Sequence, residues 1–164
     1  KGGLQAALAP AAVRANLDAV GVHAPVLVEN LDHQSRAYDH VVDPPFLRDL
    51  MTGTGTGLLL DLAHAVISAR HLGEPSPLAY IQRFVAARLR EVHLCAPTVQ
   101  PDGTLLDVNQ PFTFMPEVVG LVRYLLGEHR RGVCGDDDLL LTFECPRDLQ
   151  AQLCAAEALI DGKE

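Results

Sequence analysis

Hydrophobic residues along the chain fall into two alternating kinds of run. Short runs rich in Val and Leu predict strands, which we place at residues 24–29, 57–62, 90–94 and 139–145. Longer runs with apolar residues every three or four positions predict helices, at residues 10–20, 44–52, 63–72, 76–89, 114–130 and 147–160. The stretch between the third strand and the helix at 114 contains Pro97, Pro101, Gly103 and Asn109, and it is predicted to be a polar loop.

Two helix boundaries have specific signals. Gly73 follows the helix at 63–72, and Ser76 precedes Pro77 as an N-cap followed by a first-turn proline. Strands that alternate with helices predict parallel pairing through helical crossovers, which is an α/β fold. We read residues 1–164 as one α/β domain, since a chain of 164 residues can bury a real core.

Each predicted strand ends in residues that can ionise or bind metal. The first run ends in Glu29 and Asn30, the second in Asp61 with His64 three residues later, the third in His93 and the fourth in Glu144. Glu29 and Asp61 are 32 positions apart, and so are Asp61 and His93. A strand–helix–strand unit takes roughly 30 residues or more. The same structural position therefore recurs along the chain.

The carboxyl ends of parallel strands meet at one edge of a sheet or barrel, where active sites form. Clustered carboxylates and imidazoles repel one another and are costly to desolvate, and a divalent cation relieves both problems. This donor set suits Fe, Mn, Zn or Co. Taken singly, an acidic strand-end residue is usually a helix cap or ion-pair partner, and His93 alone could be a core histidine. The occurrence of such residues at the ends of all four strands favours a metal site.

Composition excludes several classes of function. A formal net charge of −8 argues against binding the nucleic-acid backbone, which requires clustered cations. We expect no membrane segment, because no apolar run approaches the ~20 residues of a membrane helix. The four cysteines form no CxxC pair, which favours reduced thiols and a cytoplasmic location.

Five segments carry a resemblance to a known family. VENLDH (28–33), GLLLDLAHAVISA (57–69), YIQRF with LREVHL (80–94), DVNQPF (107–112) and LTFECP (141–146) resemble, in order, the multinuclear non-haem iron-dependent oxidases. That family, formerly labelled a domain of unknown function, includes the methanobactin biosynthesis oxidase. The resemblance covers residues 24–146.

The resemblance implies a TIM-type barrel that binds two or three irons and modifies peptides with dioxygen, often at cysteine and often with a partner protein that presents the substrate. Carried over by position, it implies that the metal ligands or their immediate neighbours are Glu29, Asn30, Asp61, His64, His93, Asp107 and Glu144. At the family's Asp-x-His motif this chain has Asn109 after Asp107, and an amide oxygen is a poorer iron ligand than imidazole.

Length is the larger departure from the family. A full barrel needs eight strands and typically ~250 residues, whereas this chain offers four clear strands that match the second half of the family. The sheet edges and apolar faces of a half-barrel need cover. We therefore expect a fragment of a longer protein, one of two half-barrel chains, or a homo-oligomer.

Three functional readings follow. The first is an iron-dependent oxidase, or part of one, that modifies a peptide or a small thiol-containing substrate. The second is a non-catalytic half-barrel interaction module, favoured by Asn109 and by the missing first half. The third is a xylose-isomerase-like barrel enzyme that uses Mg or Mn in the same cluster.

Overall fold

The computed structural model describes residues 10–21, 26–32, 42–54, 56–84, 88–134 and 138–163. The strands are β1 (Leu27–Glu29), β2 (Gly57–Asp61), β3 (Leu89–Val99), β4 (Leu105–Pro111) and β5 (Leu140–Phe143). The helices are α2 (Pro10–Gly21), α3 (Pro44–Thr54), α4 (Leu62–Leu72), α5 (Pro77–Gln82), α6 (Pro116–Arg130) and α7 (Leu149–Ile160), with a 3-10 turn, η3 (Phe112–Phe114), before α6. Among these residues, no helix is both long enough and apolar enough to pass through a bilayer.

Four strands, β1, β2, β3 and β5, pair in parallel and in chain order. The register places Glu29 beside Leu59, Asp61 beside His93, and His93 beside Thr142. The predicted parallel α/β fold is therefore confirmed. The wall of a TIM-type barrel is likewise built from parallel strands that neighbour one another in chain order. Closure of this sheet into a barrel stays a prediction.

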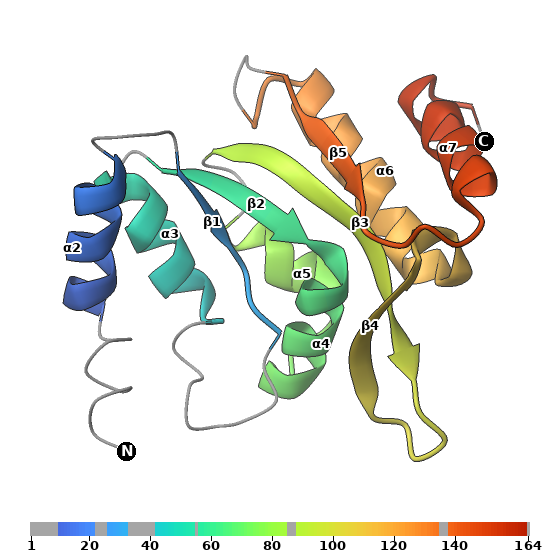
Figure 1. The fold of residues 1–164 in the computed structure, drawn as a ribbon, viewed down its shortest axis with the longest axis horizontal. Coiled ribbons are helices and arrows are strands. Elements are labelled where there is room, and N and C mark those ends of the chain that lie inside the picture. The colour runs from blue at the N-terminus through green and yellow to red at the C-terminus, as the bar shows by residue number, and fades with distance from the viewer. Residues whose placement is uncertain are drawn as a thin grey trace.

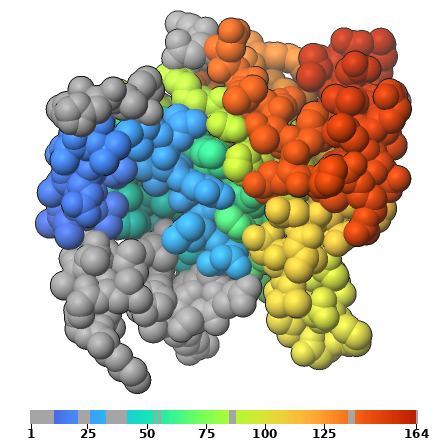
Figure 2. Space-filling model, in the orientation of Figure 1, coloured from blue at the N-terminus to red at the C-terminus, as the bar shows by residue number. Residues whose placement is uncertain are grey.

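The two faces of the sheet differ in what covers them. Leu58 and Leu60 of β2 and Leu94 of β3 are completely buried in the main apolar core, and α4, α5 and α6 lie behind the strands in Figure 1. Side chains alternate along a strand, so Glu91 and His93 point to the opposite face, where both are half-buried. Figure 2 shows residues of β2 and β3 at the surface in the middle of that face.

β3 is longer than the sequence predicts, and the predicted polar loop is wrong. β3 continues to Val99 and pairs with the antiparallel strand β4 through a turn at residues 100–104. Gly103 adopts a left-handed φ of 85° in this turn, a conformation glycine accepts without steric cost. Pro97 lies where the β3–β4 register shifts, and such an irregularity tolerates a residue without an N–H.

The end of the helix predicted at 76–89 is also wrong. Its start is confirmed, since Ser76 accepts a hydrogen bond from the backbone N–H of Ala79 at 3.1 Å, but α5 ends at Gln82. Leu89 instead begins β3, where it pairs with Leu58 of β2. Sheet pairing therefore outweighs the local helical pattern. Residues 24–25 of the first predicted strand, and 85–87 of this helix, lie outside the described residues.

Candidate metal centre

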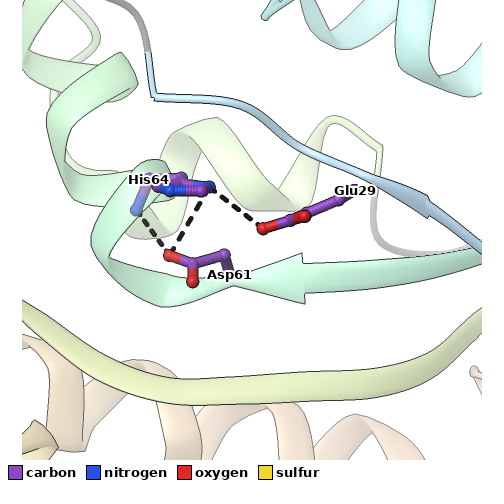
Figure 3. Close-up of side chains that lie close together, drawn as sticks. All are labelled: Glu29, Asp61 and His64. Carbon is purple, nitrogen blue, oxygen red and sulfur yellow. Dashed lines mark hydrogen bonds and ion pairs between the residues drawn. The ribbon is translucent and has the colours of Figure 1, made fainter. Parts of the chain in front are cut away.

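Three of the predicted ligands meet where β1 and β2 end. Glu29 is the last residue of β1, Asp61 is the last residue of β2, and His64 lies in the first turn of α4. Each offers one ligand atom, and these atoms lie within 4.8 Å of one another. Dashed lines in Figure 3 join His64 to both carboxylates.

The spacing of Asp61 and His64 has a local cause. Asp61 is the N-cap of α4, and its Oδ1 accepts the backbone N–H of His64 at 2.7 Å. Side-chain oxygens of N-cap residues bond the N–H groups that the first helical turn leaves unpaired. One carboxylate oxygen thus caps the helix, while Oδ2 makes contacts with other residues of the site.

Asn30 fixes the backbone of Asp61. Its Nδ2 donates to the Asp61 carbonyl at 3.0 Å, and its Oδ1 accepts the Asp61 N–H at 2.8 Å. The Asn30 side chain is completely buried. Both of its polar atoms are therefore engaged in holding Asp61, and its assignment as a ligand stays a prediction.

Three partners orient the ring of His64. Nδ1 lies 2.8 Å from the Asn30 carbonyl and 3.3 Å from Glu29 Oε1, and Nε2 lies 3.0 Å from Asp107 Oδ2. A carbonyl only accepts, so Nδ1 carries a hydrogen and donates it. This arrangement leaves Nε2 as the atom able to bind metal, as is usual for ligating histidines whose other nitrogen is held by an oxygen.

A second group lies on the other side of Asp61. Asp61, Cys95 and Glu144 offer ligand atoms within 4.8 Å of one another. The Cys95 thiol donates to Asp61 Oδ2 at 3.1 Å. His93 Nδ1 lies 3.0 Å from Glu144 Oε1 and 3.6 Å from Asp61 Oδ2. Asp61 is therefore common to both groups, with one oxygen facing each.

Burial dominates the electrostatics of the site. Burial raises the pKa of Asp61 from 3.8 to about 6, against the lowering effects of the His64 charge and backbone N–H. Burial also lowers the pKa of His64, but the Asp61 charge and the contacts with Asn30 and Asp107 outweigh it, so the net pKa is raised. Burial beside Asp61 raises the pKa of the Cys95 thiol. Negative charge on Asp61 or Cys95 is thus costly without a counterion.

Several buried polar atoms have no hydrogen-bond partner among the described residues: His93 Nδ1, Asp107 Oδ1 and Asn109 Oδ1. Buried polar atoms are normally paired, so each such exception needs a cause. Carboxylate oxygens lie close to imidazole nitrogens, with Asp107 beside His64 and Glu144 beside His93. These are the hard and borderline donors of Fe, Mn or Zn sites. The residues present therefore fit a divalent metal.

All seven predicted residues lie around this point, in contact with one another through hydrogen bonds or ion pairs. Sequence reasoning missed Glu91 and Cys95. Glu91 Oε1 lies 3.5 Å from His93 Nε2 and accepts the hydroxyl of Thr142. Both missed residues lie two positions from His93, so the period-2 alternation of a longer third strand was the signal that could have found them.

Comparison with known proteins gives one family. The family described as "RiPP precursor modification enzyme MbnB/TglH/ChrH" matches residues 5–131. A UPF0276 protein of Caulobacter vibrioides (strain NA1000 / CB15N) is 34% identical over 95 residues, which is 57% of this chain and 34% of that protein. A UPF0276 protein of Rhizobium meliloti (strain 1021) is 41% identical over 66 residues, covering 39% of this chain and 21% of that protein.

The matched segments thus span about a third or less of the length of these curated relatives. No solved structure matches the chain. Glu144 lies outside the residues that the family match covers, whereas the other six predicted site residues lie inside them. The chain belongs to the RiPP precursor modification enzyme family MbnB/TglH/ChrH.

Proposed function

We propose that this chain carries the metal centre, or a large part of it, of an iron-dependent oxidase that modifies a precursor peptide. The observation that carries the proposal is the position of Asp61, which belongs to two groups of metal-capable side chains, one with Glu29 and His64 and the other with Cys95 and Glu144. A buried carboxylate with donors on both sides is suited to two neighbouring ions. Two ions lie within the number that the family resemblance implies.

The residues divide into two sets of ligands. Glu29, His64 and Asp107 would hold one ion, while His93 and Glu144 would hold the other, and Asp61 would serve both. Asn30 is the positioning residue for Asp61 and, through its carbonyl, for His64. When bound, iron would supply redox chemistry toward dioxygen and Lewis acidity toward a substrate thiol.

The protein residues prepare this chemistry by geometry and by exclusion of water. Asp61 is only 1% exposed, and the side chain of His64 is 13% exposed. Their low exposure keeps the local dielectric low, which strengthens every electrostatic contact within the site. The more exposed Glu29, at 37%, lies at the side from which a substrate would approach.

The peptide substrate is supported by the family to which the chain belongs. The sheet face that carries Glu91 and His93 is the one without covering helices in Figure 1, which supports a half-barrel completed by further chain, by a second copy or by a substrate-presenting partner. The non-catalytic module remains a second candidate, because Asn109 stands where the resemblance implies a histidine ligand.

Metal content tests the proposal. Protein purified anaerobically is expected to contain iron, and Asp61→Ala and His93→Ala are expected to lose part or all of it. His129→Ala, in the last turn of α6, is the matched control and should keep its iron. Absence of metal from the wild type, or unchanged metal in both site variants, would contradict the proposal.

Oxygen uptake separates the candidates. The iron-loaded protein with glutathione, a cysteine-containing peptide, is expected to consume oxygen faster than Asp61→Ala under the same conditions. Bound metal without such uptake favours the interaction module. A preference for Mg or Mn, again without oxygen uptake, favours the isomerase-like reading.

A further inference from the structure

Cys95 lies on β3 two residues after His93, on the edge of the site where β2 and β5 also end. Its side chain is completely buried. The thiol does not face apolar atoms alone, because it donates to Asp61 Oδ2 at 3.1 Å. A packing role in the core would not require this direction, which brings the sulfur to the carboxylate shared by both groups.

The other cysteines provide the contrast. Cys134 is equally buried but belongs to the main apolar core, Cys145 is buried after β5, and Cys154 is exposed. All four lie among the described residues, and Cys95 is the one whose sulfur falls in a group of metal-capable atoms. Its position in that group is therefore not a general property of the cysteines in this chain.

The surroundings of Cys95 call for a cation independently of the sulfur. Buried Asp61 and half-buried Glu144 bring two carboxylates into one group, where like charges repel. His93 Nδ1 lies beside both carboxylates and has no hydrogen-bond partner among the described residues. A metal ion bound there would offer that nitrogen a partner and neutralise the carboxylates.

We propose that Cys95 is a sulfur ligand of the metal ion held by Asp61, His93 and Glu144. This inference rests on the proposed function, since it adds a ligand to that same centre. On binding a divalent ion, Cys95 releases its thiol proton to solvent, and a sulfur–metal bond replaces the hydrogen bond to Asp61. The second ion then has carboxylate, imidazole and thiolate ligands.

A thiolate ligand changes the metal preference of the site. Soft sulfur donors favour Fe, Co and Zn over Mg and Mn, which prefer oxygen. The ion beside Cys95 should therefore discriminate against Mg more strongly than the ion beside Glu29 and His64. Cys95→Ser keeps a hard donor of similar size and isolates the contribution of sulfur.

The test uses the whole chain, loaded with cobalt or zinc alone. Cobalt-loaded wild type is expected to show near-ultraviolet sulfur-to-cobalt charge-transfer absorption, which Cys95→Ser loses and Cys134→Ser, the matched buried control, retains. Zinc-edge X-ray absorption of the wild type provides a second measurement, which does not depend on the folding of Cys95→Ser. It should show one sulfur at about 2.3 Å besides nitrogen and oxygen ligands.

The outcomes distinguish the two proposals. Metal bound without a sulfur ligand overturns the role of Cys95 and leaves the proposed metal centre intact. A charge-transfer band that persists in Cys95→Ser also overturns it, because another cysteine then supplies the sulfur. Failure of the wild type to bind either metal overturns the metal centre and this inference together.

Discussion

Asn30 and Asp61 are joined by a reciprocal pair of hydrogen bonds, in which the side-chain amide of one residue bonds both backbone polar groups of the other, at 2.8 and 3.0 Å. The pair links the residue after β1 to the last residue of β2 and is completely buried. It therefore sets the position from which the Asp61 carboxylate reaches both groups of the candidate metal centre.

Replacing Asn30 with alanine should destabilise the fold substantially. The variant leaves a buried N–H and a buried carbonyl of Asp61 without partners, and each such group costs about 1–3 kcal/mol. We expect a loss of roughly 2–4 kcal/mol in the free energy of unfolding, measured by urea denaturation. Ser68→Ala, which removes the bond from the Ser68 hydroxyl to the Leu31 carbonyl, should cost about 1 kcal/mol. Equal effects of the two variants would argue against the bridging role of Asn30.

The stability of the metal-free protein should depend on the charge of Asp61. Its pKa of about 6 in the fold exceeds the ordinary 3.8, so the folded state holds the proton more tightly than the unfolded state. The resulting cost is absent below about pH 4 and complete above about pH 6. Asp61→Asn removes it, and Asn also serves as an N-cap. The variant should gain on the order of 2 kcal/mol at pH 7.5 and nothing at pH 4.

Urea titrations of chelator-treated wild type and Asp61→Asn at both pH values measure this difference. Asp102→Asn provides a control of opposite sign, because the backbone N–H of Thr104 lowers the pKa of Asp102. A lowered pKa stabilises the fold as pH rises, so that variant should lose a little stability at pH 7.5. A gain for Asp61→Asn that is the same at both pH values would contradict the assignment of the cost to its charge.

The sequence predicted the strand-end positions because apolar runs and βα spacing are local properties. Asp61 illustrates why single-residue readings compete: it is a helix cap through Oδ1 and also a member of the site through Oδ2. The helix-cap reading is confirmed for this residue, and the metal reading stays a prediction. Whether a metal binds is decided by contacts between distant segments, which no local pattern contains.

β4 and Cys95 show where the prediction failed. Pro97, Pro101 and Gly103 indicate a loop by local rules, yet pairing with β4 continues β3 through a register shift at Pro97. The strand prediction ended at Leu94, so Cys95 fell in the predicted loop and was not considered for the site. Asp107 was found only through the family resemblance, since its proximity to His64 depends on the hairpin.

Gly57 should not tolerate a side chain. A Cβ built there would lie 2.6 Å from Leu27 Cδ2 and 2.8 Å from Arg90 Cγ, at the start of β2 where β1 and β3 flank it. Gly57→Ala should therefore destabilise the fold by about 1–3 kcal/mol. Gly120→Ala is the matched control, because a Cβ there meets nothing within 4 Å in the middle of α6, and it should stabilise by about 0.5–1 kcal/mol. A lower melting temperature for Gly57→Ala and a higher one for Gly120→Ala would support the close packing around Gly57. An unchanged melting temperature for Gly57→Ala would contradict it.

Metal stoichiometry should separate the two groups that share Asp61. Glu29→Ala removes a donor from one group, and Glu144→Ala removes a donor from the other, so each variant is expected to lose about half of the metal bound by wild type. Asp61→Ala should lose more than either, because its oxygens face both groups. Elemental analysis after dialysis against a fixed iron concentration measures this.

Loss of a helix cap is the competing explanation for a large effect of Asp61→Ala. Ser76→Ala removes the cap of α5 in the same way but lies outside both groups, so it should keep the wild-type metal content. If Ser76→Ala loses as much metal as Asp61→Ala, the effect is one of folding. If Glu29→Ala and Glu144→Ala each abolish all binding, the donors surround a single ion, and Asp61 does not serve two.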